Sequence, residues 1–222
     1  IMHIVTVIPA RGGSKSIPKK NIRLLNGKPL LSYSINYSLK SEIVNNTVVS
    51  TDSIEIAEIS KDYGAEVPFI RPSNLAQDDT PDYPVFKHAL DFLEDHYRLR
   101  IDIIILLRPT SPLRPEGLIE RGIKLIKKFS NCSSIRSVAI SNEHPYRQWC
   151  QNGDFIEGYE KGIHEPYNLE RQQLPKVYFQ TGDIEIIKRK TLINGSISGE
   201  KVLPLIINHD EMVDIDYEQD FL

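Results

Sequence analysis

The stretch His3-Ile4-Val5-Thr6-Val7-Ile8, followed directly by Pro9-Ala10-Arg11-Gly12-Gly13-Ser14, decides the fold class of this chain. Its first half is rich in β-branched residues, which is typical of a buried strand, and its second half is polar and contains two consecutive glycines. In open α/β sheets, ligands bind at the carboxyl ends of the strands, where such a loop lies. We therefore expect an α/β protein whose first loop contributes to a ligand site.

The sequence up to residue 140 repeats this alternation of apolar runs and helical patterns. Candidate strands are residues 3–8, 47–50, 66–70, 102–107 and 134–140. Helical periodicity begins at Pro29, after Ser53, after Asp82 and after Pro115. The alternation is typical of a three-layer α/β fold with a mostly parallel sheet, and apolar runs at residues 184–187 and 202–207 are expected to complete that sheet.

Length and composition indicate a single domain spanning residues 1–222. Hydrophobic residues make up 40% and charged residues 26% of the 222, which favours a buried core over disorder. The net charge of -3 argues against a nucleic-acid binder that works by bulk charge. The longest aliphatic run, residues 103–107, is far shorter than the roughly 20 residues that cross a bilayer, so we expect no membrane span.

Location is predicted from the N-terminus and the cysteines. The first strand lacks the basic and long apolar regions of a secretion signal. Cys132 and Cys150 form neither a disulfide framework nor a metal-ligand pattern, which fits a reducing compartment. We expect a cytoplasmic protein.

Residues 141–180 interrupt the periodic pattern. They contain Trp149, the only tryptophan, and four of the ten tyrosines. A segment of this length is too long for a structureless loop in a compact domain, and aromatic enrichment is typical of interfaces. We interpret the segment as an inserted arm that makes a subunit contact. An ordinary surface excursion with a hairpin is the alternative.

The loop after the first strand is strongly basic. Between residues 11 and 28 there are six basic and no acidic residues, on a chain that is net acidic. Gly12 and Gly13 allow a sharp turn that exposes backbone N–H groups, and Ser14, Lys15 and Lys20 offer hydroxyl and ammonium donors. These groups suit a phosphate, although the spacing matches neither the P-loop nor the dinucleotide-binding glycine pattern. A solvated basic turn is the alternative.

An acidic segment near the C-terminus complements that loop. Residues 209–220 contain six acidic residues and no Lys or Arg. Asp214 and Asp216 alternate with Val213 and Ile215, so an extended backbone would place both carboxylates on one face, about 7 Å apart. Such a pair can bind one hard cation that also takes phosphate oxygens, which predicts a site for a Mg2+-nucleotide. A solvated acidic terminus is the alternative.

A third cluster, Arg108-Pro109-Thr110-Ser111-Pro112-Leu113-Arg114, follows the most hydrophobic strand. The two prolines fix a rigid turn, and Arg108 and Arg114 are planar donors suited to a carboxylate or a phosphate. The position after a central strand favours a functional role over a plain turn with surface arginines.

Seven motifs occur in one order along the whole chain. They are Arg11-Gly12-Gly13-Ser14-Lys15, Ile17-Pro18, Lys20-Asn21, Arg71-Pro72, the Arg108 turn, Arg171-Gln172-Gln173-Leu174-Pro175 and Asp214-Ile215-Asp216. The set resembles the acylneuraminate cytidylyltransferases, the CMP-sialic acid synthetase family. The resemblance implies a Rossmann-like nucleotidyltransferase fold, a homodimer built through the arm, and a role in surface polysaccharide biosynthesis. The implied reaction is Mg2+-dependent transfer of CMP from CTP to the anomeric hydroxyl of a nonulosonic acid.

The same resemblance implies roles for the residues that match the motifs. The expected nucleotide-binding residues are Arg11, Ser14, Lys20, Asn21, Arg71 and Thr80. The expected catalytic residues are Arg11, Lys20, Asp214 and Asp216, of which the two aspartates are the Mg2+ ligands. The expected residues of the sugar site are Arg108, Arg147, Arg171, Gln172 and Thr181. Arg171 would reach the sugar from a second subunit.

The sugar side departs from the family pattern. The family usually has Gln where this chain has Arg108, and Asn-Gly-Ala-Ile-Tyr where it has Thr181-Gly182-Asp183-Ile184-Glu185, while Phe179 replaces an arginine of some members. These changes alter the charge and the hydrogen-bond polarity of the acceptor pocket. Arg108 and Arg171 are our candidates for binding the acceptor's carboxylate. The alternatives are 3-deoxy-manno-octulosonate or another acid as acceptor, and a degenerate member that binds a nucleotide sugar without making one.

Overall fold

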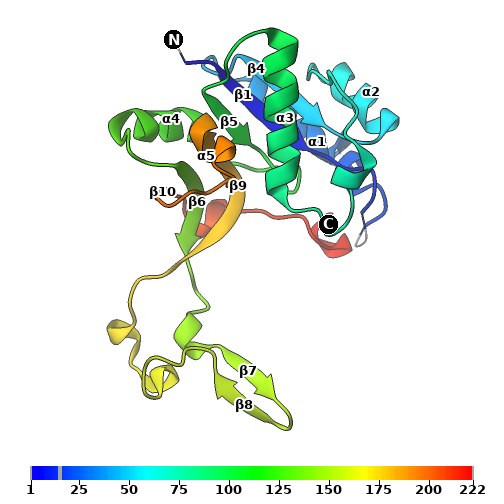
Figure 1. Cartoon of the computed structure of the whole chain (residues 1–222). Coiled ribbons are helices and arrows are strands. Elements are labelled where there is room, and N and C mark those ends of the chain that lie inside the picture. The colour runs from blue at the N-terminus through cyan, green and yellow to red at the C-terminus, as the bar shows by residue number, and fades with distance from the viewer. Residues whose placement is uncertain (1, 15–16, 222) are drawn as a thin grey trace.

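The computed structural model describes residues 2–14 and 17–221 and shows a three-layer α/β fold around one six-stranded sheet (Figure 1). The strands, in the spatial order β10-β6-β9-β5-β1-β4, are β1 (Ile4–Pro9), β4 (Asn46–Ser50), β5 (Ile103–Leu106), β6 (Ser134–Ile140), β9 (Tyr178–Lys188) and β10 (Val202–Ile206). β1 is parallel to β4 and β5, and β10 is parallel to β6. β9 is antiparallel to both of its neighbours. The expected mostly parallel sheet is confirmed.

Helices cover both faces of the sheet. They are α1 (Leu30–Leu39), α2 (Ile54–Asp62), α3 (Asp82–Tyr97), α4 (Leu118–Lys128) and α5 (Arg189–Ile193). One apolar cluster joins the sheet to α1, α2 and α4, and a second joins it to α3 and α5. α2 begins where the sequence predicts, because the Ser53 hydroxyl accepts a hydrogen bond from the backbone N–H of Ile56. Gly122 lets α4 approach β9 closely, since a Cβ there would lie 2.2 Å from Ile186 Cδ1.

The predicted strand at residues 66–70 is wrong. Glu66 makes one isolated parallel bridge with Val48, and the following residues are irregular. Pro68 has no N–H to donate to a strand ladder, so regular pairing does not continue through it. The segment instead buries Phe69 in the apolar cluster beneath α3, edge-on to the ring of His88.

Two short antiparallel pairs lie outside the main sheet. They are β2 (Leu24–Leu25) with β3 (Lys28–Pro29), and β7 (Trp149–Asn152) with β8 (Phe155–Gly158). The second pair belongs to the segment expected to form an arm, residues 141–180, whose last three residues begin β9. Figure 1 shows that this β7–β8 hairpin lies far from the sheet, at the end of two extended connections. We call residues 141–177 the arm.

The arm leaves large apolar side chains exposed. Phe155 is 80% exposed, and Trp149, Ile156 and Tyr159 are also exposed, although the Trp149 ring packs on Tyr167 with ring centroids 4.3 Å apart. A lone two-stranded hairpin is at best marginally stable in water. The arm therefore presents an apolar surface that no other part of the described chain covers.

Membrane and thiol expectations can also be compared with the structure. No helix among the described residues has the length and apolar character that a bilayer crossing requires. Cys132 is buried and Cys150 is exposed, and both are free thiols.

Candidate active site

A cavity of about 400 Å³ lies at the carboxyl ends of β1 and β5. Its walls come from the loop after β1, the segment before α3 and the turn after β5. The predicted site residues that line it are Arg11, Ser14, Lys20, Asn21, Arg71, Thr80 and Arg108. The structure thus brings all six expected nucleotide-binding residues to one cavity, while their contact with a nucleotide stays a prediction.

The loop after β1 is held tightly over the start of α2. The backbone N–H of Gly12 donates to Asp52 Oδ1 at 2.8 Å. A Cβ on Gly12 would lie 3.1 Å from Ser53 Cβ, so this close passage favours glycine. The Asn21 amide donates to the backbone oxygen of Arg11 at 3.0 Å and closes the loop on itself. Gly12 and Asn21 therefore shape the loop that carries Arg11 into the cavity.

Arg11 already has a counter-charge at the cavity wall. Its guanidinium forms an ion pair with Asp78, and the two side chains are 30% and 41% exposed. Because partly exposed ion pairs are only weakly favourable, an anionic ligand can compete with Asp78 for this guanidinium. Ser14 lines the same cavity, and Lys15, the other predicted donor of this loop, lies outside the described residues.

The basic loop and the acidic C-terminal segment are in direct contact. The Lys20 ammonium donates to the backbone oxygen of Ile215 at 2.8 Å and to Asp216 Oδ1 at 3.0 Å. Ile215 is buried, and its N–H donates to the backbone oxygen of Thr110 at 2.8 Å. Two segments 196 residues apart in sequence therefore meet beside the turn that follows β5.

Asp214 and Asp216 lie together at this junction. Partial burial raises the pKa of Asp214 above its ordinary value, and the negative charge of Asp216 raises it further, against a hydrogen bond from Thr110 and the charge of Lys20. A carboxylate whose charge is destabilised by a neighbouring carboxylate is suited to share a cation with it.

A magnesium ion fits this pair of carboxylates only with further oxygen ligands. Among the described residues, no group of three or more His, Cys, Asp and Glu side chains could hold a metal ion. Mg2+ commonly binds through one or two protein carboxylates together with substrate phosphates and water. Asp214 and Asp216 meet that requirement beside a cavity lined with cations.

Arg71 braces the segment that forms one wall of the cavity. Its Nη2 donates to the backbone oxygen of Ser50 at 2.6 Å, and its Nη1 donates to that of Leu75 at 3.3 Å. Burial lowers the pKa of Arg71 below its usual value. Arg71 thus fixes the chain that leads to Thr80, and its edge remains in the cavity lining.

Arg114 is a structural part of the turn after β5. It is buried, which lowers its pKa to about 10, and its Nε donates to the backbone oxygen of Asp183 at 2.6 Å. Its other nitrogens donate to Ser34 Oγ at 2.9 Å and to the backbone oxygen of Arg108. The expectation that Arg114 offers a donor to a ligand is therefore replaced by a bracing role.

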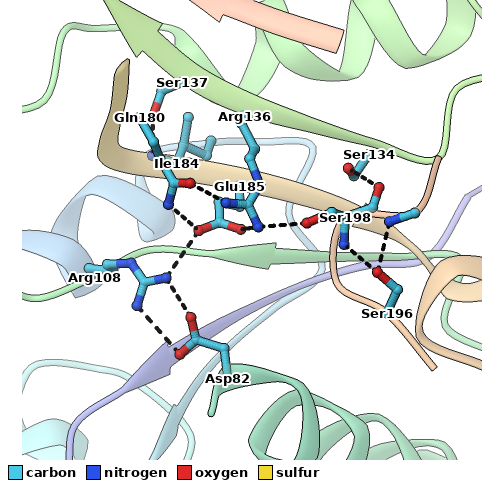
Figure 2. Close-up of polar contacts among 11 residues, drawn as sticks. Asp82, Arg108, Ser134, Arg136, Ser137, Gln180, Ile184, Glu185, Ser196 and Ser198 are labelled. Carbon is cyan, nitrogen blue, oxygen red and sulfur yellow. Dashed lines mark hydrogen bonds and ion pairs between the residues drawn. The ribbon is translucent and has the colours of Figure 1, made fainter. Parts of the chain in front are cut away.

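Arg108 is held between two carboxylates (Figure 2). Its Nη2 donates to Asp82 Oδ2 at 2.6 Å and to Glu185 Oε1 at 3.0 Å. Burial alone would lower the pKa of Arg108, but Asp82 and Glu185 outweigh burial and raise it. Arg108 lines the cavity as predicted, but it does so as an ion-paired group.

The remaining predicted sugar-site residues do not line the cavity. Arg147, Arg171 and Gln172 lie in short 3-10 turns of the arm, where Arg147 Nη2 donates to the backbone oxygen of Leu169 at 3.0 Å. Thr181 is buried, and its hydroxyl hydrogen-bonds Ser137 Oγ at 2.9 Å. Within one chain these residues therefore do not contribute to the cavity lining, and their contact with a sugar stays a prediction.

Sequence reasoning missed the partners of the arginines. Asp78 and Asp82 lie in the cavity wall, and Glu185 contacts both Arg108 and Arg136. One signal was available: Asp183 and Glu185 alternate with isoleucines in a strand, and a buried carboxylate usually has a partner. The identity of that partner depends on which strands are neighbours, which the local pattern does not give.

The sheet topology, with a cation-lined cavity and an acid pair at the carboxyl ends of its strands, defines a nucleotide-binding α/β protein of the nucleotidyltransferase type. Residues 5–149 match the family model described as "Cytidylyltransferase". The chain belongs to the cytidylyltransferase family.

Individual relatives agree with this assignment over most of the chain. The CMP-N,N'-diacetyllegionaminic acid synthase of Legionella pneumophila is 36% identical, over 97% of this chain and 91% of its own length. The N-acylneuraminate cytidylyltransferase of Escherichia coli is 32% identical, over 98% of this chain and 50% of its own length. The solved structure of a CMP:2-keto-3-deoxy-manno-octonic acid synthetase complexed with CTP has a TM-score of 0.71 at 16% identity, over 98% of this chain and 94% of that one. The last likeness supports the fold.

Proposed function

We propose that this cytidylyltransferase transfers CMP from CTP to the anomeric hydroxyl of a nonulosonic, sialic-acid-like sugar and releases pyrophosphate. The observation that carries the proposal is the contact of Lys20 with Asp216 beside the cavity that Arg11 also lines. A triphosphate requires cationic donors for its oxygens and an acid pair for its metal ion, and this junction supplies both.

The chain's own residues would act by binding and orienting the reactants. Arg11 and Lys20 are placed to bind phosphate oxygens, and the loop closed by Asn21 holds them at the end of β1. In the reaction, the anomeric oxygen forms a bond to the α-phosphorus, and the bond from that phosphorus to the pyrophosphate oxygen breaks. Such transfers depend mainly on positioning and charge neutralisation.

Asp214 and Asp216 would hold Mg2+ at this site. The ion supplies positive charge that neutralises the triphosphate and the departing pyrophosphate. Lys20 also provides positive charge to Asp216, through an ion pair of 3.0 Å. The Mg2+ requirement is supported by the donor set and by the raised pKa of Asp214.

The acceptor class is supported by the relatives. Two of them are named for acylated nonulosonic acids, and both align with nearly the whole chain. We propose an acceptor with acylamino substituents, in the cytoplasm, where CTP is made. The second candidate, 3-deoxy-manno-octulosonate, is kept because Arg108 and Glu185 replace the residues usual in sialic-acid enzymes. A degenerate nucleotide-sugar binder is disfavoured by the intact cavity lining.

Pyrophosphate release from CTP, measured with a panel of nonulosonic acids and with 3-deoxy-manno-octulosonate, tests the proposal. We expect release with at least one acylated nonulosonic acid, and loss of that release when EDTA removes Mg2+. Release with the octulosonate alone would favour the second candidate. No release with any acid would contradict the proposed function.

We further propose that two copies of the chain associate through the arm. The exposed apolar side chains of the β7–β8 hairpin have no cover in their own chain among the described residues. A second copy would cover them and could bring its Arg171 to the sugar, since the arm projects far enough to reach another molecule (Figure 1).

A further inference from the structure

Glu185 lies buried between two arginines next to the cavity (Figure 2). It is on β9, opposite Leu106 of β5 and opposite Arg136 of β6, and it is 1% exposed. Its Oε1 accepts from Arg108 Nη2 at 3.0 Å, and its Oε2 lies 3.0 Å from Arg136 Nη2. One buried carboxylate therefore connects the cavity wall to the strand beyond it.

These contacts occupy Nη2 of Arg108, the donor that a ligand carboxylate would need. A guanidinium binds a carboxylate through two parallel N–H bonds, which come either from Nη1 and Nη2 or from Nε and Nη2. Both hydrogens of Arg108 Nη2 are engaged, one by Asp82 at 2.6 Å and one by Glu185 at 3.0 Å. Nη1 also lies 3.5 Å from Asp82 Oδ1. No parallel pair of N–H bonds remains for a ligand carboxylate.

Single N–H bonds of Arg108 do remain. Its Nε–H and one Nη1–H have no acceptor among the described residues. They lie on different edges of the guanidinium, so each can donate one hydrogen bond to a neutral oxygen. Because Arg108 lines the cavity, these are the donors that it can offer to a ligand there.

The net charge around Arg108 also disfavours the binding of a ligand carboxylate. Asp82, Arg108, Glu185 and Arg136 form a chain of alternating charges with no net charge. Arg136 is anchored in turn, because it donates to Gln180 Oε1 and, at 2.8 Å, to the hydroxyl of Ser198. A charge-balanced wall attracts an anion much less than a lone guanidinium would.

We propose that Glu185 is a positioning residue, which turns Arg108 so that it recognises the acyl carbonyl oxygen of an acylamino group on the acceptor sugar. This inference rests on the proposed function and names the group of the acceptor that Arg108 binds. It replaces the expectation that Arg108 binds the acceptor's carboxylate. In this inference the carboxylate is bound by another cation, such as Arg171 of a second subunit.

The test compares two acceptors with one variant. The acceptors are an acylated nonulosonic acid and its analogue with a hydroxyl in place of the acylamino group, which has the same carboxylate. In Glu185→Gln, of nearly the same shape, we expect KM for the acylated acid to rise about tenfold, which corresponds to one charge-assisted hydrogen bond. KM for the hydroxyl analogue and for CTP should stay within about twofold, since neither uses the acyl contact.

The control is Glu94→Gln. Glu94 also pairs with an arginine, Arg189, at 2.7 Å, and lies on α3, away from the cavity lining. It should change thermal stability and leave every KM unchanged. A rise in KM for both acids in Glu185→Gln would mean that the pair reads the shared carboxylate, and unchanged KM values would remove Glu185 from recognition. Either result overturns the inference.

A second variant separates position from charge. Glu185→Asp keeps the charge but is one methylene shorter and loses its reach to Arg108, so it should also lose the preference for the acylated acid. Full preference in Glu185→Asp would contradict positioning. If the wild-type chain releases no pyrophosphate with either acid, the proposed function has failed before the variants are compared.

Discussion

The cavity after β1 and the arm after β6 differ in how far one chain completes them. In the cavity, Arg11, Lys20 and Arg108 each face a carboxylate of the same chain. In the arm, the apolar faces of Trp149 and Phe155 remain exposed. From this comparison we expect that a single chain carries a preformed nucleotide side and that, in the dimer we propose, the second copy completes the acceptor side.

The largest expected effect follows from removing one carboxylate of the acid pair. Asp214→Asn should lower turnover with CTP at least about 1,000-fold, because the amide is a poorer ligand for Mg2+ and carries no charge. Pyrophosphate release measures the loss, and circular dichroism should show an unchanged fold. The matched control is Asp210→Asn, on an exposed carboxylate of the preceding 3-10 turn that is not one of the two proposed metal ligands. Near-normal Mg2+-dependent activity in Asp214→Asn would rule out the metal role.

The second prediction concerns the junction of the two charged segments. Lys20→Gln should lower kcat/KM for CTP about 100-fold, since it removes a phosphate-binding cation and the bond to the Ile215 carbonyl. The neighbouring Lys19 pairs with Glu55 on the surface at 2.7 Å, so Lys19→Gln serves as the control. Steady-state kinetics with varied CTP distinguish the two, and equal losses in both variants would show that general surface charge is responsible.

The third prediction tests whether two copies of the chain associate through the arm. Phe155→Ser should raise the dissociation constant of the dimer about tenfold by removing a large apolar anchor from the interface. Sedimentation at micromolar concentration measures this change, while CTP binding should persist. Ile54 is also an exposed apolar residue, but it lies on α2, so Ile54→Ser should leave association unchanged. A wild-type monomer with full activity would remove the arm from both association and catalysis.

The smallest expected effect sharpens the description of the cavity. Asp78→Asn removes the charge that competes with a triphosphate for Arg11, so KM for CTP should fall about threefold, as expected for a partly exposed ion pair. Raising the salt concentration should shrink the difference between the variant and the wild type. An increase in KM instead would show that Asp78 helps to orient Arg11 for the ligand.

Much of the fold could be predicted because its elements depend on local patterns. The predicted and observed bounds of β6, Ser134–Ile140, coincide, and the Ser53 cap begins α2 as expected. The strand predicted at residues 66–70 was wrong because the prediction gave more weight to the apolar residues of this run than to Pro68. The antiparallel direction of β9 was not predicted either, because the direction of this strand depends on the path of the arm that precedes it.

The sequence predicted which residues line the cavity better than it predicted the ion pairs around Arg108, for a physical reason. The loop after β1 carries its donors in one continuous segment, so a linear reading identifies them. Glu185 contacts Arg108 and Arg136 only because β9 lies between β5 and β6. The alternation of Glu185 with isoleucines indicates a buried carboxylate, but no short stretch of sequence identifies the arginines that pair with it.

The bond from Lys20 to the carbonyl of Ile215 has a consequence for biosynthesis. A nascent chain can assemble β1, β4 and β5 before Asp214 and Asp216 have left the ribosome. A product that terminates before residue 214 would therefore keep most of the sheet and lack the two proposed metal ligands. On the proposed function, a copy can hold a magnesium triphosphate only after residues 214–216 have been made and have folded beside Lys20.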